Sequence, residues 1–237
     1  MLLTIIKILL IVPFTIIMSI VCIVAMIVYK NNALFDSLVG FWYKGLLALG
    51  GVKISVKGLE NIPDSRSCIF VANHASYYDI PAAMIGLGTN RLRIVYKKEL
   101  ERIPIFGWAM RWTGMYIAIN RGRGVEAQQS LDRAINRIKN GDSVLLFPEG
   151  TRTSDGKLQP FKRGAFNIAT KAGVPIVPVI INGSYTVMSR STFKITPGTI
   201  TLTIEKPIAP PDEGGKSSEL EVMDLVHQSI EQHYINQ

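Results

Sequence analysis

An apolar run over residues 8–29 most constrains how this chain can fold, because its 22 residues contain no charged side chain. As an α-helix the run would be about 33 Å long, at about 1.5 Å per residue, which matches a bilayer hydrocarbon core of about 30 Å. A signal peptide fits less well, because the run is long and no small-x-small cleavage site follows it. A buried core helix would normally show a polar stripe. The run therefore predicts a helix that inserts into a membrane, and Pro13 is a point where it can kink.

A second apolar segment, residues 33–50, has a different pattern. Leucines and aromatic residues recur at helical spacing, while polar side chains such as Lys44 interrupt the run. This pattern predicts an amphipathic helix in the membrane interface, with Trp42 and Tyr43 at headgroup level. An ordinary core-packing helix is the alternative.

The two segments divide the chain into a membrane-binding helical pair, residues 1–50, and a domain of residues 51–237. Lysines gather after the long apolar run, at positions 30, 44, 53 and 57. By the positive-inside rule, this charge places the domain on the cytoplasmic face of a membrane, which is the inner membrane if the source is bacterial. Hydropathy is compatible with a first helix that crosses the bilayer and with one that stays in one leaflet beside the second.

The net charge of +8 is concentrated in one stretch, because residues 91–123 hold eight basic and two acidic side chains. A local positive field of this kind attracts phosphates, acidic proteins or anionic lipid, although a solvated basic face is also compatible with it. Nucleic acid is not expected as a partner, because the stretch contains no recognisable binding motif and includes an apolar run at 103–108. The two cysteines and three histidines show no metal-ligand spacing, so no metal site is expected.

From residue 52 onward, short apolar strands alternate with amphipathic helices. The predicted strands are 52–56, 67–72, 92–96, 115–119, 143–147, 176–181 and 200–204. Predicted helices cover 105–113, 125–139 and 164–172, and a last helix begins at a capping box formed by Ser218 and Glu221. This alternation predicts an α/β fold with a mostly parallel central sheet flanked by helices. In such sheets, sites form in the loops at the carboxyl ends of the strands.

The first candidate site follows the strand that ends at residue 72. His74 and Asp79 are five residues apart, which on one helix would place them about 140° apart, so they meet only if the backbone turns between them. In that geometry Asp79 accepts a hydrogen bond from one imidazole nitrogen and leaves the other free as a general base. The alternative is that Asp79 caps the helix that starts at Ile80 and that His74 is a core histidine.

The second candidate site is the loop Phe-Pro-Glu-Gly-Thr-Arg at residues 147–152. Gly150 lets the backbone approach a ligand closely, Thr151 adds a hydroxyl, and Arg152 adds a planar guanidinium suited to phosphate. The pattern indicates either a phosphate-binding loop or an ordinary turn with a surface ion pair. It is not a nucleotide-hydrolysis loop, because the Gly-Lys that follows is one residue too far and Leu158 stands where Ser or Thr is required.

Together, the two motifs resemble the glycerolipid acyltransferases that carry the HxxxxD motif, and most closely the bacterial lysophosphatidic acid (1-acyl-sn-glycerol-3-phosphate) acyltransferases. Two further blocks agree with this resemblance. Residues 114–121, which end in Arg121, are similar to the second family motif, and residues 177–179 are similar to the fourth. The four motifs occur in order between residues 73 and 179. The family often has serine after the third-motif arginine, where this chain has Thr153.

The resemblance implies an enzyme that moves an acyl chain from a thioester, acyl-CoA or acyl carrier protein, to the sn-2 hydroxyl of lysophosphatidic acid. The product would be phosphatidic acid, in phospholipid biosynthesis. By the same resemblance, His74 is the base and Asp79 orients it. The implied phosphate-binding set comprises Lys97 or Lys98, Arg121, Gly150, Thr151 and Arg152, with Glu149 orienting an arginine. No cofactor is expected besides the thioester co-substrate, because the thioester is already activated.

Other functions stay open at this point. Transfer to another lysophospholipid would use the same machinery. A thioesterase or lipase is disfavoured by the lack of a G-x-S-x-G nucleophile elbow in the sequence. A non-catalytic membrane scaffold would not require these motifs. The sequence does not decide the acyl donor, the chain length or the oligomeric state.

Overall fold

A seven-stranded sheet organises the computed structural model, which describes residues 1–29, 32–64, 67–88, 91–113, 116–119, 125–210 and 215–236. The strands are β1 (Val52–Lys57), β2 (Ile69–Ala72), β3 (Leu92–Lys97), β4 (Tyr116–Ile119), β5 (Ser143–Leu146), β6 (Ile176–Asn182) and β7 (Gly198–Ile204). Their order across the sheet is β1-β7-β6-β2-β5-β3-β4. All described strand pairs are parallel except β6 with β7. The predicted mostly parallel α/β fold is confirmed.

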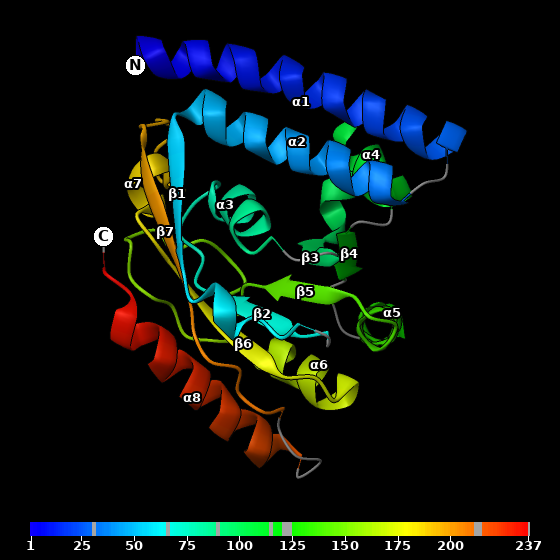
Figure 1. Ribbon diagram of the computed structural model, residues 1–237, viewed down its shortest axis with the longest axis vertical. Coiled ribbons are helices and arrows are strands. Elements are labelled where there is room, and N and C mark those ends of the chain that lie inside the picture. The colour runs from blue at the N-terminus through cyan, green and yellow to red at the C-terminus, as the bar shows by residue number, and fades with distance from the viewer. Residues whose placement is uncertain are drawn as a thin grey trace.

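Helices cover both faces of this sheet (Figure 1). They are α1 (Leu2–Tyr29), α2 (Asn32–Gly50), α3 (Asp79–Gly86), α4 (Phe106–Thr113), α5 (Val125–Lys139), α6 (Gly164–Ala172), α7 (Ser184–Met188) and α8 (Lys216–His233), with 3-10 turns at Leu59–Asn61 and Lys98–Arg102. Helices α5, α6 and α8 pack on one face. Helix α3 packs on the other face, and α2 lies over α3.

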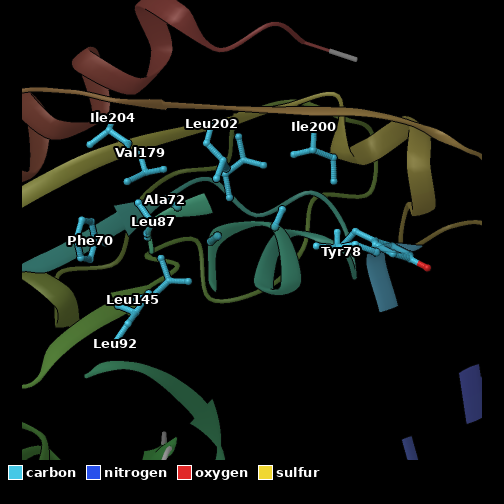
Figure 2. Packing of buried hydrophobic residues seen from close by; sticks show 14 of the residues in the cluster. Phe70, Ala72, Tyr78, Leu87, Leu92, Leu145, Val179, Ile200, Leu202 and Ile204 are labelled. Carbon is cyan, nitrogen blue, oxygen red and sulfur yellow. The ribbon is translucent and has the colours of Figure 1, made fainter. Parts of the chain in front are cut away.

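The central strands are apolar along their whole length because both of their faces are buried. In β2, Ile69 and Val71 point towards α5 and α6, while Phe70 and Ala72 point towards α3. Figure 2 shows the α3 side of this core, where side chains from β2, β3, β5, β6 and β7 gather with Tyr78 and Leu87, the residues at the two ends of α3. Because β2 lies between β5 and β6, the loops that follow these strands emerge together at one edge.

The N-terminal helices lie side by side and run along the domain (Figure 1). Helix α1 is long and apolar enough to cross a membrane, and most of its aliphatic side chains are exposed. Helix α2 buries one stripe against the domain, formed by Phe35, Val39, Tyr43 and Leu47.

The predicted headgroup position of Tyr43 is wrong. Its side chain is 2% exposed, and its hydroxyl lies 2.8 Å from that of Tyr116 on β4. Residues four apart share a helix face, so Tyr43 belongs with the stripe that faces the domain. The indole of the neighbouring Trp42 donates to the Thr15 hydroxyl of α1 at 3.2 Å. Trp42 therefore joins α2 to α1, and Tyr43 joins α2 to the domain.

The C-terminal helix begins earlier than its sequence predicts. Helix α8 starts at Lys216 with Gly215 at the N-cap position, so the proposed capping residues Ser218 and Glu221 lie inside the first turns. Glu219, between them, instead turns inward to accept a hydrogen bond from Asn167 at 2.8 Å and to pair with Arg163 at 3.1 Å. Tertiary contacts to α6 therefore set the start of this helix.

Candidate active site

His74 and Asp79 meet in a tight turn directly after β2. The Nδ1 atom of His74 lies 2.7 Å from Oδ2 of Asp79. The same oxygen accepts hydrogen bonds from the backbone N–H groups of Ala75 and Ser76, each at 2.7 Å. The carboxylate thus holds the turn that brings it to the ring, and it occupies the first position of α3 rather than its N-cap. Since a carboxylate oxygen accepts only, Nδ1 carries the proton and Nε2 is left as a possible base.

The imidazole is held in place from a second side. It stacks on Phe147, with ring centroids 4.1 Å apart and an angle of 20° between planes. Asp79 is fully buried, whereas the His74 side chain keeps 16% of its surface exposed. A fixed ring with one accessible edge is the arrangement that a general base requires.

The loop after β5 is hydrogen-bonded to the backbone of His74. Glu149 accepts a hydrogen bond from the His74 N–H at 2.6 Å, and the Thr153 N–H donates to the His74 carbonyl at 2.9 Å. The other Glu149 oxygen accepts from the Gln159 N–H at 3.1 Å. Among the described residues, the printed donors to both Glu149 oxygens are backbone amides, so Glu149 positions the His74 backbone here, and its predicted role of orienting an arginine stays a prediction. The two sequence motifs form one hydrogen-bonded unit.

Burial changes the acidity of this carboxyl group. Glu149 is 3% exposed, and desolvation raises its pKa to about 7. The hydrogen bonds from His74 and Gln159 act in the opposite direction, and the nearby Asp79 charge adds to the rise. Glu149 therefore titrates near neutral pH while it holds the backbone of the histidine.

Positive side chains line the rim of the 147–152 loop. The guanidinium carbon of Arg152 lies 3.4 Å from the centroid of the Tyr77 ring. The Thr151 hydroxyl accepts a hydrogen bond from Arg190 at 3.0 Å. Gly150 has a positive φ of 76°, and a Cβ there would lie 2.7 Å from Nζ of Lys162. The loop is thus surrounded by three cations and can receive an anion.

Of the remaining predicted phosphate ligands, the structure describes the side chain of Lys98 alone. Lys98 lies in the 3-10 turn after β3, where its Nζ is 3.8 Å from a carboxylate oxygen of Glu126. The side chain of Lys97 and the whole of Arg121 lie outside the described residues. Their predicted roles stay predictions.

An apolar cavity of about 460 Å³ adjoins the histidine turn. This volume falls in the usual range for ligand pockets, about 300–1,000 Å³. Residues on both sides of Asp79, namely Tyr77, Tyr78, Ile80 and Pro81, form part of its wall. The rest comes from α1, α2, β3 with the 3-10 turn that follows it, α4, β4 and the end of α7 with the segment after it, and includes Ile11, Leu46, Ile94, Met110 and Phe193. The cavity suits a hydrocarbon chain.

A larger cavity, of about 1040 Å³, lies at the amino ends of β3 and β5, away from the histidine. Its charged lining is an ion-pair network around the buried Asp142, which meets Arg91 at 2.9 Å, Arg137 at 2.7 Å and Arg93 at 3.6 Å. Arg93 also contacts Asp36 of α2 at 3.2 Å. Two arginines of the basic stretch 91–123 are therefore engaged in ion pairs with Asp142, and one of them, Arg93, joins α2 to the domain.

Within the described residues, no three His, Cys, Asp or Glu side chains gather where they could hold a metal ion. Ser76, the hydroxyl nearest to His74 in sequence, donates instead to the Met188 carbonyl at 2.8 Å. Its hydroxyl therefore holds the turn.

The sequence motifs do not contain several residues that shape this site. Lys162, Arg190 and Phe193 lie beyond the third motif, and nothing in their spacing marks them. Each reaches the site because its loop folds back over the carboxyl ends of β2 and β5.

Comparison with known proteins places these features in context. Residues 53–182 match the model of the family described as Acyltransferase. A chloroplastic 1-acyl-sn-glycerol-3-phosphate acyltransferase of Brassica napus is 39% identical over 158 residues, which cover 66% of this chain and 45% of that protein. The 1-acyl-sn-glycerol-3-phosphate acyltransferase of Saccharomyces cerevisiae is 33% identical over 172 residues, which cover 71% of this chain and 55% of that protein. This chain therefore spans about half the length of these relatives.

A solved structure agrees over nearly the whole chain. The crystal structure of the 1-acyl-sn-glycerophosphate acyltransferase PlsC from Thermotoga maritima superimposes with a TM-score of 0.80 and 29% sequence identity. The match covers 98% of this chain and 94% of that one, so it includes the N-terminal helices as well as the sheet.

Proposed function

This chain belongs to the acyltransferase family, and from that membership we propose that it transfers an acyl group from a thioester to the sn-2 hydroxyl of lysophosphatidic acid. The observation that carries the proposal is the His74–Asp79 pair, which adjoins a cation-rimmed loop on one side and an apolar cavity on the other. Those three features match the needs of the reaction, which are a base for the hydroxyl proton, a site for the phosphate and a slot for the acyl chain. The names of the relatives support the same acceptor.

The proposed step needs no enzyme nucleophile. Nε2 of His74 takes the proton of the sn-2 hydroxyl as its oxygen attacks the thioester carbonyl carbon. The C–S bond then breaks, and the leaving thiolate receives the proton from the imidazolium. Asp79 stabilises the imidazolium between these events because it accepts the Nδ1 hydrogen bond. The products are phosphatidic acid and a free thiol, which belongs to coenzyme A or to acyl carrier protein.

The apolar face of α1 suits a membrane-bound substrate. Among its exposed side chains are Leu9, Val12, Ile16, Ile17, Ile20 and Val24. We propose that this face lies in one leaflet, because α1 runs along the domain beside α2 rather than away from it (Figure 1). We assign that leaflet to the cytoplasmic side on the charge pattern alone, because lysines follow the apolar run. Cavity walls from α1 and α2 then lie close to the lipid, so the substrate need not enter bulk water.

Replacing the base tests the proposal. His74→Ala should lower kcat for phosphatidic acid formation by about 100-fold or more, because general base catalysis contributes about 10²–10⁴-fold. Binding of lysophosphatidic acid should persist. His233→Ala, at an exposed histidine on α8, is the matched control and should keep full activity. Retained activity of the His74 variant would refute the base, and release of free fatty acid without acceptor would indicate a hydrolase.

A further inference from the structure

The segment that follows α7, residues 188–195, lies outside all four sequence motifs and yet folds over the histidine turn. Ser76 and Ser189 form an antiparallel bridge, and the Met188 carbonyl accepts hydrogen bonds from the Ser76 hydroxyl at 2.8 Å and from the Tyr77 N–H at 3.4 Å. The Ser189 hydroxyl lies 3.1 Å from that of Thr192, which shapes the next turn. The segment is therefore fixed relative to His74.

This segment brings the guanidinium of Arg190 to the 147–152 loop, which is the third sequence motif. Arg190 donates to the Thr151 hydroxyl at 3.0 Å, while Arg152, the next residue of that loop, lies over the Tyr77 ring. Among the described residues, neither guanidinium forms an ion pair with a carboxylate. The buried Glu149 does not neutralise them, because its oxygens face backbone amides. Within the part of the chain that the structure describes, no carboxylate therefore pairs with Arg190 or with Arg152, which both lie at the 147–152 loop.

The same segment also borders the apolar cavity. Met188, Phe193 and Ile195 contribute to the cavity wall, and the Phe193 ring lies 6.5 Å from that of Tyr77. Phe193 is 69% exposed, so its ring lies at the surface where the cavity opens. Residues 188–195 therefore join the cationic rim to the mouth of the cavity.

From this placement we infer that Arg190 binds the phosphate of the acceptor together with Arg152, with the Thr151 hydroxyl between them. The inference rests on the proposed function and adds a ligand that the sequence motifs do not supply. A phosphate monoester carries up to two negative charges and three acceptor oxygens, so it can engage two guanidinium groups at once. Held there, the acceptor would lie beside both the histidine turn and the cavity mouth.

The test compares the purified full chain with Arg190→Ala, Arg190→Lys and Lys194→Ala, assayed with acyl-CoA or acyl carrier protein thioester as donor. Lys194 is the matched control, because it is an exposed cation on the same segment. Each protein receives lysophosphatidic acid and, separately, a phosphate-free 1-acylglycerol. Arg190→Ala should raise KM for lysophosphatidic acid about 10-fold to 100-fold, since it removes charge-assisted hydrogen bonds. Arg190→Lys should restore part of the loss, and kcat/KM for the phosphate-free acceptor should be unchanged.

Three results separate the possible failures. If Arg190→Ala and Lys194→Ala raise KM equally, only the general positive field matters and the inference is overturned. Equal losses of Arg190→Ala on both acceptors would show that Arg190 merely steadies the 147–152 loop, which also overturns it. If the unmodified chain acylates neither acceptor with either donor, the proposed function itself fails.

Discussion

Glu149 is a buried carboxyl group whose two oxygens accept from the backbone N–H groups of His74 and Gln159. Burial raises its pKa from 4.5 to about 7, so the folded protein holds a proton that the unfolded chain has already lost between these values. The stabilisation associated with that proton is fully present below about pH 4.5 and is lost as the pH rises through 7. The residue that positions the histidine backbone thus changes its charge near neutral pH.

Glu149→Gln should show how much of the pH dependence of Tm comes from the titration of Glu149. The variant cannot ionise, so the Tm of the unmodified protein should fall relative to that of the variant between pH 5 and pH 8. The kcat of the variant should also fall, because the side-chain NH2 group of glutamine cannot accept a hydrogen bond from a backbone N–H. Glu60→Gln, at an exposed glutamate, is the control. A gap in Tm that does not change with pH would contradict the raised pKa.

At this scale the sequence predicts side-chain pairs better than it predicts backbone partners. The His74–Asp79 contact was expected because only a turn could join two residues at that spacing, and the turn is present. The partners of Glu149 are amides from two different loops, and no side-chain pattern encodes such donors. Arg190 is similar, since its position depends on how the segment after α7 returns to the site.

At the scale of elements, most strands and helices follow from local patterns. The helix at Gly164–Ala172 ends at Gly173, as expected, because that residue adopts the left-handed conformation that glycine tolerates. The stripe of α2 was harder to assign, because an apolar face can point to lipid or to protein and only the tertiary fold decides. The apolar cavity has no local signature at all, since its walls come from seven separate segments.

The cavity nevertheless makes a prediction about chain length. Met110 on α4 is buried and lines the cavity wall. Met110→Trp should fill part of the space and shift the ratio of kcat/KM from long-chain towards medium-chain acyl thioesters. Met110→Leu, which conserves volume, should leave the ratio unchanged. Equal activity of the tryptophan variant with both donor lengths would show that the transferred chain lies elsewhere.

At the scale of the whole molecule, the N-terminal helices serve the membrane and the core together. Helix α2 buries Tyr43 and Leu47 in the clusters that α3 and the sheet complete. Lys7 of α1 donates to the carbonyl of Gly50, the last residue of α2, at 2.7 Å. Deleting residues 1–50 would therefore expose core side chains as well as remove the apolar face. Point substitutions on the exposed face of α1 give a cleaner test.

Ile17 and Val24 are 58% and 50% exposed on α1, so glutamates there should leave the packing intact. A charged side chain at the centre of a membrane-inserted helix costs about 2.5–3.5 kcal/mol, and Ile17→Glu with Val24→Glu should move the protein from the membrane pellet to the supernatant. Leu225→Glu is the matched control, because that leucine is 53% exposed on α8, on the opposite side of the molecule (Figure 1). If the double variant stayed in the membrane pellet with the control, a surface other than α1 would bind the protein to the membrane. The first candidate would be α4, which exposes Trp108 and Trp112 and packs beside α1.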